Sequence, residues 1–279
     1  MALDVVVVIG VGGMGEAIAR RQGSGRHLVI GDFNTATLDA VEARLLADGF
    51  GVTALQVDVG DLASVQDLAD AAAALGPVAQ VIHTAGLSPI QAPVEAILRV
   101  DIVGVANTLD VFGDVVAPGG AGVVIASMAG TMSQGRFPAE MENALALTPT
   151  DQLLGLPFLA PGAIGDPGAA YGIAKRANQL RVQTAAVAWG RRGARVNCLS
   201  PGIVATPMGH GELESPAGAI MRMMVGGSAT GRIGTPEDVA AAAAFLLGPG
   251  ASFITGADLL VDGGVVAAIR SGAIQLPTR

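Results

Sequence analysis

The segment of this sequence with the clearest capacity for chemistry is a tyrosine followed four positions later by a lysine, Tyr171-Gly-Ile-Ala-Lys175. Residues four apart in an α-helix lie on one face, so the phenol and the ammonium can share one cleft. A phenol is a poor acid near neutral pH, but a nearby cation stabilises the phenolate and lowers its pKa. The pair therefore predicts an acid/base device, although the same spacing also occurs in exposed helical pairs that have no function.

A glycine-rich turn near the N-terminus has the spacing of a dinucleotide-binding motif. It follows the apolar run 4–9, precedes a helix-compatible segment, and has the pattern G-x-G-x-x-G over Gly10, Gly12, Gly13, Met14 and Gly15. Such glycines permit a tight turn and the close approach of backbone N–H groups to a pyrophosphate at a helix N-terminus. We therefore expect a dinucleotide site, with a chance match in a glycine-rich chain as the alternative.

Two carboxylates at the ends of expected strands are candidate contacts to the adenosine half of a dinucleotide. Asp32, followed by Phe33, can accept hydrogen bonds from the ribose hydroxyls and would repel a 2′-phosphate, which favours NAD over NADP. No arginine or lysine lies in the glycine turn or directly after Asp32 to receive that phosphate. Asp58, followed by Val59, could bind the adenine amino group. The alternatives are a turn aspartate at position 32 and a helix cap at position 58 or at Asp61.

The composition excludes several other classes of function. The net charge of −8 provides no basic stripe for nucleic acid. The one cysteine, Cys198, cannot form an intrachain disulfide and is expected to be a small buried hydrophobe. The three histidines are far apart, which disfavours a metal site; they are His27, His83 and His210. The apolar runs are too short to span a membrane, and we expect a cytoplasmic protein.

Short β-branched segments alternate with longer Ala/Leu-rich segments, which predicts helices around a parallel sheet. The expected strands are 4–9, 27–31, 52–57, 78–83, 121–126, 194–199 and 257–261. The expected helices are 14–23, 35–48, 62–75, 94–117, 169–190 and 236–247. The predicted fold is α/β, a single domain over residues 1–279 with a doubly wound parallel sheet of the Rossmann type. Ligands of such sheets bind beyond the carboxyl ends of the strands.

Two segments interrupt this alternation. Residues 128–168 form a proline-rich excursion before the tyrosine, and residues 202–235, with a short helix expected over 217–225, form a candidate substrate lobe. Long excursions in compact domains tend to be lids or binding loops.

Taken in order, the motifs resemble those of the short-chain dehydrogenase/reductase family over nearly the whole chain. They are the glycine turn, Asp32, Asp58-Val59, Thr84-Ala85-Gly86, Ser127, Tyr171-x-x-x-Lys175, Val196-Asn197 to Pro201-Gly202, Arg232 to Val239, and Thr255 to Gly264.

The resemblance implies an oxidoreductase in which each motif residue has a role. Ser127 would polarise the substrate carbonyl or hydroxyl, Tyr171 would be the general acid or base, and Lys175 would hold the nicotinamide ribose. Gly86 would let the chain pass close to the cofactor, and Ile203 and Thr206 would orient its carboxamide. The remaining implied cofactor contacts are Thr84, Ala85, Pro201 and Gly202.

Three positions depart from the family pattern. The glycine turn is one residue shorter than usual, and His83 stands where the family has an asparagine, which we expect to be a structural substitute. Asp101 stands where a helix asparagine usually holds a water linked to the lysine. We expect Asp101 to keep this proton relay working, and its charge to raise the lysine pKa and so weaken the effect of the lysine on Tyr171.

The expected substrate is a secondary alcohol or ketone, apolar or steroid-like, because the excursion 128–168 is flanked by two catalytic residues and family members acting on hydroxysteroids include chains with such an insertion. Its apolar side chains and the methionines of the lobe could line a pocket, or could be loop anchors or an oligomer contact; they are Leu153, Leu154, Leu156, Phe158, Leu159, Met208, Met221, Met223 and Met224. No charged anchor for an acidic substrate stands out.

The resemblance also predicts a homo-oligomer, a tetramer or a dimer, formed through helices near 101–117 and 169–190 and through the C-terminal segment, with the tail 269–279 reaching a neighbour. Two other functions remain open: a non-enzymatic NAD sensor on the same fold and an NADPH-dependent carbonyl reductase. The intact Ser127, Tyr171 and Lys175 disfavour the first, and Asp32 disfavours the second.

Overall fold

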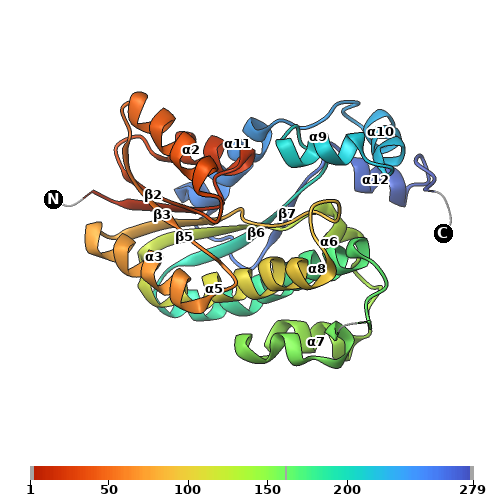
Figure 1. Cartoon of the computed structure of the whole chain (residues 1–279), viewed down its shortest axis with the longest axis horizontal. Helices are drawn as coiled ribbons and strands as arrows, with labels where there is room; N and C mark the ends of the chain where they lie inside the picture. The colour runs from red at the N-terminus through yellow and green to blue at the C-terminus, as the bar shows by residue number, and fades with distance from the viewer. Residues whose placement is uncertain (1–2, 161, 277–279) are drawn as a thin grey trace.

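The computed structural model describes residues 3–160 and 162–276 and has a parallel sheet of seven strands at its centre (Figure 1). The strand order is β3-β2-β1-β4-β5-β6-β7. The strands are β1 (Val5–Ile9), β2 (His27–Asp32), β3 (Gly51–Gln56), β4 (Val78–His83), β5 (Val116–Ile125), β6 (Arg195–Pro201) and β7 (Asp258–Val261). The predicted doubly wound α/β fold is confirmed.

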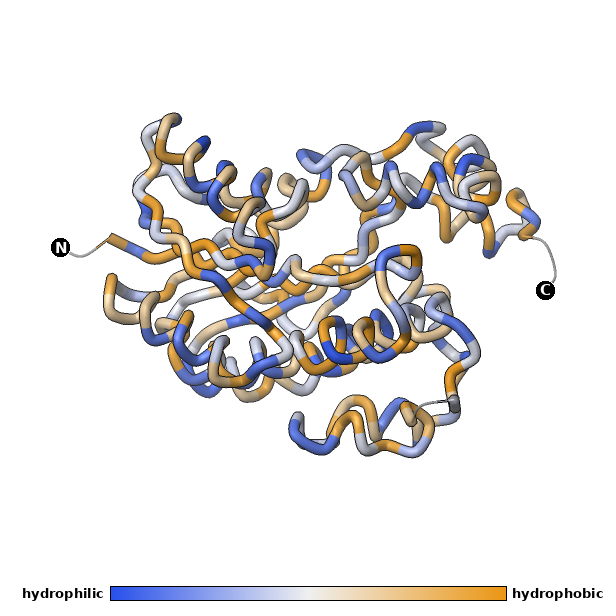
Figure 2. Tube along the Cα trace, viewed as in Figure 1, coloured by the Kyte–Doolittle hydropathy of each residue, from blue (hydrophilic) through white to orange (hydrophobic). Residues whose placement is uncertain are grey.

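The alternation of side chains along the strands creates one core on each face of the sheet. Val5, Val7 and Ile9 of β1 pack with helices α3 (Leu62–Leu75), α5 (Gly104–Val115) and α8 (Pro167–Arg191) on one face. Val6 and Val8 pack with α1 (Gly13–Gln22), α2 (Thr35–Ala47) and α11 (Pro236–Leu247) on the other. Figure 2 shows hydrophobic residues concentrated along the central strands, as a strand buried on both faces requires.

The strand register brings the candidate cofactor residues to one edge of the sheet. Ile9 is paired with Gly31 in β2 and with His83 in β4. The glycine turn, Asp32 and Thr84 therefore follow neighbouring strand ends, at the carboxyl edge where parallel sheets bind ligands.

The helix expected over 94–117 is divided into three parts. It consists of α4 (Val94–Leu98), a π-helical turn η1 (Arg99–Val103) and α5, and it ends at residue 115 because β5 begins at Val116. The π-helical turn contains Asp101, and such turns inside helices are frequent at functional sites.

The excursion 128–168 consists of α6 (Met128–Met132), α7 (Ala139–Leu147) and the 3₁₀ turns η2 (Thr150–Gly155) and η3 (Pro157–Leu159). Beyond α6 it turns away from the sheet, and α7 lies on the far side of α8 (Figure 1). Leu153 and Leu159 are buried in a cluster with side chains of α4, η1 and α8, so these two leucines are loop anchors and not pocket linings. Of the alternatives left open for these side chains, loop anchoring therefore describes Leu153 and Leu159.

Polar contacts attach the excursion to two helices at once. Arg181 of α8 is buried and donates to the carbonyls of Leu145 and Thr148, and Thr150 donates through its hydroxyl to Asp110 of α5. Arg176 of α8 forms an ion pair with Glu142 of α7 at 2.8 Å. The excursion thus covers part of the outer surface of α5 and α8, the two helices through which self-association was expected.

The lobe after β6 contains α9 (Pro207–Glu214) and α10 (Gly218–Gly227), and α12 (Val265–Arg270) packs beside it. A small apolar cluster joins the lobe to α6; its buried members include Met128, Ile203, Met224 and Val265. Met224 is therefore part of this cluster, and the helix expected over 217–225 is α10. Within the described residues, no helix is long and apolar enough to cross a membrane, and no three His, Cys, Asp or Glu side chains form a group that could hold a metal ion.

Candidate active site

Helix α8 positions the tyrosine and the lysine. The Asp166 side chain accepts a hydrogen bond from the N–H of Ala169 at 2.9 Å and caps the helix, so Tyr171 lies in its second turn and Lys175 one turn later. The Lys175 ammonium is 5.3 Å from the centre of the Tyr171 ring. The two side chains therefore lie together on one face of α8, as expected.

Ser127 approaches the same point from the neighbouring strand. It follows β5, and its hydroxyl caps α6 by accepting from the N–H of Ala129 at 3.1 Å. The same hydroxyl lies close enough to Tyr171 to lower the pKa of the phenol. Close contact between α6 and α8 requires Gly130, because a Cβ there would lie 2.6 Å from the Lys175 carbonyl oxygen. The three residues of the expected catalytic set therefore meet in space.

Asp101 forms a direct ion pair with Lys175, at 2.9 Å between Oδ2 and Nζ. Both side chains are buried, at 0% and 5% exposure. The other oxygen, Oδ1, accepts from the N–H of Leu87 at 2.8 Å. The resemblance implied a link between this position and the lysine through water; the structure has a direct contact, because the carboxylate reaches the ammonium.

The electrostatics of this cluster differ from the expectation for Tyr171. Burial raises the pKa of Tyr171 and is the largest effect; Lys175 lowers this pKa, Asp101 raises it, and the hydroxyl of Ser127 lowers it. Lys175 thus lowers the pKa of Tyr171 as expected, but burial outweighs this effect and the net direction is upward. Burial acts to lower the pKa of Lys175, but Asp101 and Tyr171 together raise it, as expected for Asp101.

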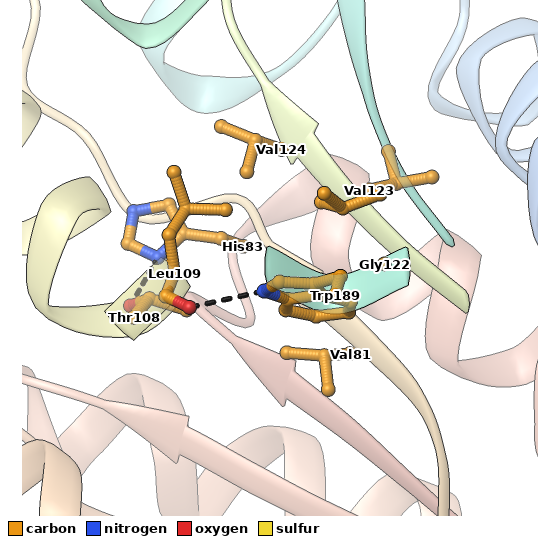
Figure 3. Close-up of a pocket in the computed structure, with 9 residues that line it drawn as sticks. Val81, His83, Thr108, Leu109, Gly122, Val123, Val124 and Trp189 are labelled. Atoms are coloured by element: carbon orange, nitrogen blue, oxygen red, sulfur yellow. Dashed lines mark hydrogen bonds between the residues drawn. The ribbon is translucent and has the colours of Figure 1, made fainter. Parts of the chain in front are cut away.

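His83 lies in the core behind the cluster and has no exposed face. Its Nδ1 is 3.0 Å from the hydroxyl of Thr108 in α5, next to a small cavity that Trp189 also lines (Figure 3). Burial, followed by the charge of Lys175, lowers the pKa of His83 to about 3, so the ring is neutral. It links β4 to α5, which agrees with a structural role.

The glycine turn has the geometry that a pyrophosphate requires. Gly10 has a φ of 87° and touches the backbone of Ala85, so a side chain fits neither the conformation nor the space. Gly15 packs against the carbonyl of Gly10, and the hydroxyl of Thr84 donates to the same carbonyl. At the start of α1, Gly12 faces open space and no described side chain caps the helix. Free N–H groups beside open space fit an anionic dinucleotide.

Asp32 lies against the glycine turn. Its Oδ2 accepts from the N–H of Val11 at 2.8 Å and its Oδ1 accepts from the N–H of Asn34 at 2.9 Å. Beside it is a hollow large enough for part of a ligand, lined by Phe33, Gln56, Asp58, Asp61 and Ser64. A ribose and an adenine ring can therefore follow the pyrophosphate along this edge.

Asp58 has a partner that the sequence did not indicate. It forms an ion pair with Arg99 of η1 at 2.7 Å and accepts from the N–H of Gly60, whereas Asp61 caps α3. The side chain of Val59 is buried in the core, so only its backbone can face a cofactor. Arg99 and Asp58 are more than forty positions apart, and no local pattern links them.

The residues after β6 close the cleft from the lobe side. Gly202 packs against Asp262, and Ile203 is buried in the apolar cluster of the lobe. Thr206 caps α9, and its methyl group would lie 3.1 Å from a Cβ at Gly13. Pro201 ends β6, and the segment that follows it reaches the glycine turn at Thr206.

One charged residue near Tyr171 was missed. Glu212 of α9 is partly buried, and its charge acts on Tyr171 to raise the phenol pKa. The only sequence signal was its spacing of four from Met208, which places both on one face of a helix that was itself not predicted.

Comparisons with known proteins agree with this geometry. Residues 4–139 match the family described as short chain dehydrogenase, and residues 146–266 match the one described as Enoyl-(Acyl carrier protein) reductase. The chain is 40% identical to short-chain dehydrogenase/reductase bsc3 of Alternaria brassicicola over 96% of this chain and 97% of that protein. It is 30% identical to D-threitol dehydrogenase of Mycolicibacterium smegmatis over 90% of this chain and 88% of that protein.

Among solved structures, a short-chain glucose/ribitol dehydrogenase from Brucella melitensis is similar with a TM-score of 0.74 and 23% identity. The similarity covers 95% of this chain and 99% of that one, and it supports the fold.

Proposed function

This chain belongs to the short-chain dehydrogenase/reductase family, and from that premise we propose that it interconverts a secondary alcohol and a ketone with NAD as the hydride carrier. Members of this family use a nicotinamide cofactor, NAD or NADP. The observation that carries the proposal is the meeting of Ser127, Tyr171 and Lys175 at the sheet edge that also holds the glycine turn.

Each residue has a distinct part in the proposed reaction. The cofactor, when bound, supplies or accepts the hydride. Tyr171 gives a proton to the reacting oxygen in ketone reduction and takes it in alcohol oxidation. Ser127 hydrogen-bonds the same oxygen, and Lys175, held by Asp101, keeps a positive charge beside the phenol. Because the pKa of Tyr171 is raised, its phenol form prevails near neutral pH, which favours reduction there and oxidation at higher pH.

The preference for NAD is supported by Asp32, whose carboxylate lies at the glycine turn. We expect Asp32→Asn to weaken NADH binding by about tenfold, because it removes a charge-assisted hydrogen bond to the ribose. The difference in affinity between NADH and NADPH should also become smaller, because the repulsion between the carboxylate and the 2′-phosphate is removed. Fluorescence titration with both cofactors measures this. Asp39→Asn, an exposed aspartate of α2, is the matched control and should bind both as the parent does. Equal affinity of the unchanged protein for NADH and NADPH would contradict the preference and support the reductase alternative.

A panel of secondary alcohols and ketones tests the reaction itself, with NADH absorbance as the readout. The name of the threitol-oxidising relative supports an alcohol substrate. Turnover of any member of the panel supports the proposal. Tight NADH binding without turnover of any member would favour the non-enzymatic sensor instead.

A further inference from the structure

We propose that Glu212 is a substrate-binding residue that accepts a hydrogen bond from a second polar group of the substrate, a hydroxyl or an ammonium close to the reacting carbon. The inference rests on the proposed alcohol/ketone chemistry and narrows its substrate class. It replaces the apolar, steroid-like substrate expected from the sequence with a polyfunctional alcohol.

Helix α9, which carries Glu212, packs against three segments of the candidate active site. Its first turn follows Thr206, which touches the glycine turn. In its middle, a Cβ at Gly211 would lie 3.3 Å from Ile90, in the loop that follows Gly86. Near its end, Leu213 packs against the apolar cluster that contains Met128 of α6. The helix thus contacts the segments that lead to the cofactor, to Asp101 and to Ser127.

One face of α9 is turned inward. Met208 and Glu212, one turn apart, are both partly buried, whereas His210 and Glu214 are exposed. The inward face of α9 lies near enough to the catalytic set for the Glu212 charge to act on the Tyr171 phenol. In Figure 1, α9 lies across from α6 and α8, the helices that carry the catalytic set.

The Glu212 carboxylate has no partner in the described part of the chain. No described residue gives it a hydrogen bond or an ion pair, and burial raises its pKa. Two other partly buried glutamates are paired: Glu16 with Arg20 and Arg44, and Glu142 with Arg176. An unpaired, partly desolvated carboxylate is costly unless a ligand supplies the donor. A hydroxyl or an ammonium can do so, while a carboxylate or a phosphate on the substrate would be repelled.

Matched alcohols with and without the second group test the inference. The pairs are 2,3-butanediol with 2-butanol, and 1-amino-2-propanol with 2-propanol, each oxidised with NAD by the intact protein. We expect Glu212→Gln to lower kcat/KM about tenfold or more for the aminoalcohol, mainly through KM, because the ion pair is lost. The decrease in kcat/KM should be smaller for the diol, because the amide oxygen of the introduced glutamine still accepts a hydrogen bond. The simple alcohols should be unaffected or improve, because a charge that opposes phenolate formation is removed.

The outcomes separate this inference from the proposed function. A selective loss for the aminoalcohol alone identifies a cationic substrate group, and a loss for both bifunctional alcohols, larger with Glu212→Ala, identifies a hydrogen-bond donor in general. Glu214→Gln, on the exposed face of α9, is the matched control and should leave kcat/KM unchanged for both bifunctional alcohols. If Glu212→Gln changes all four alcohols equally or none of them, Glu212 does not bind substrate although the alcohol chemistry stands. If the parent protein oxidises no alcohol, the proposed function fails and this inference fails with it.

Discussion

Replacement of Tyr171 with phenylalanine is expected to lower kcat for alcohol oxidation by about two to four orders of magnitude, the usual contribution of a positioned acid or base. The substitution removes one oxygen and leaves the ring against Lys175, so the fold and the glycine turn are untouched. NADH affinity should therefore remain close to that of the parent. Steady-state rates at saturating alcohol, together with a fluorescence titration of NADH, measure the two quantities separately.

A companion variant leaves Tyr171 in place and changes Ser127 beside it. Ser127→Ala removes the hydroxyl that contacts the phenol and should lower kcat as well, while NADH binding again persists. A Tyr171→Phe protein that keeps most of its activity would show that another group transfers the proton.

Replacement of Asp101 with asparagine is expected to lower the free energy of unfolding by about 3–5 kcal/mol, the cost of leaving one member of a buried ion pair without its partner. Asparagine has nearly the same shape as aspartate, so the decrease in the free energy of unfolding comes from the lost charge and not from a cavity. Chemical denaturation at neutral pH measures it. Asp48→Asn is the matched control, because Asp48 forms an exposed pair with Arg20 and its loss should cost under about 1 kcal/mol.

The same Asp101→Asn protein should also show a shifted pH–rate profile. Oxidation uses the phenolate, so its rate rises with pH through the pKa of Tyr171. The charge of Asp101 raises the pKa of Tyr171. Removing this charge therefore lowers the pKa of Tyr171 as long as Lys175 stays protonated. The rising limb of the profile then moves to lower pH. No shift in either limb would rule out the coupling, and a shift to higher pH would show that Lys175 loses its proton instead.

The sequence was sufficient for the sheet and for the position of the glycine turn because these depend on local patterns. Buried parallel strands are continuous β-branched runs, and the glycines of the turn are required by backbone geometry at positions such as Gly10. Helix α4–α5 was predicted as one segment because a π-helical turn leaves no clear mark on hydrophobic periodicity.

The excursion shows what local patterns leave undetermined. An apolar segment near a catalytic residue has the same composition whether it lines a pocket or docks on a neighbouring helix, and Leu153 does the second. The difference lies in partners far along the chain, such as Arg181 with the carbonyl of Leu145. Glu212 was missed for the same reason: the proposal for it depends on the lack of a partner for its carboxylate among the described residues.

The close approach of Lys175 to the Tyr171 ring has a practical consequence, because Tyr171 is the one tyrosine of the chain. Ionisation of a phenol changes its ultraviolet absorbance, and in this protein no second phenol contributes to the change. The spectrum of the whole protein therefore acts as an optical indicator at the reacting position, and an alkaline titration records how Asp101→Asn or Glu212→Gln changes proton affinity there without any turnover.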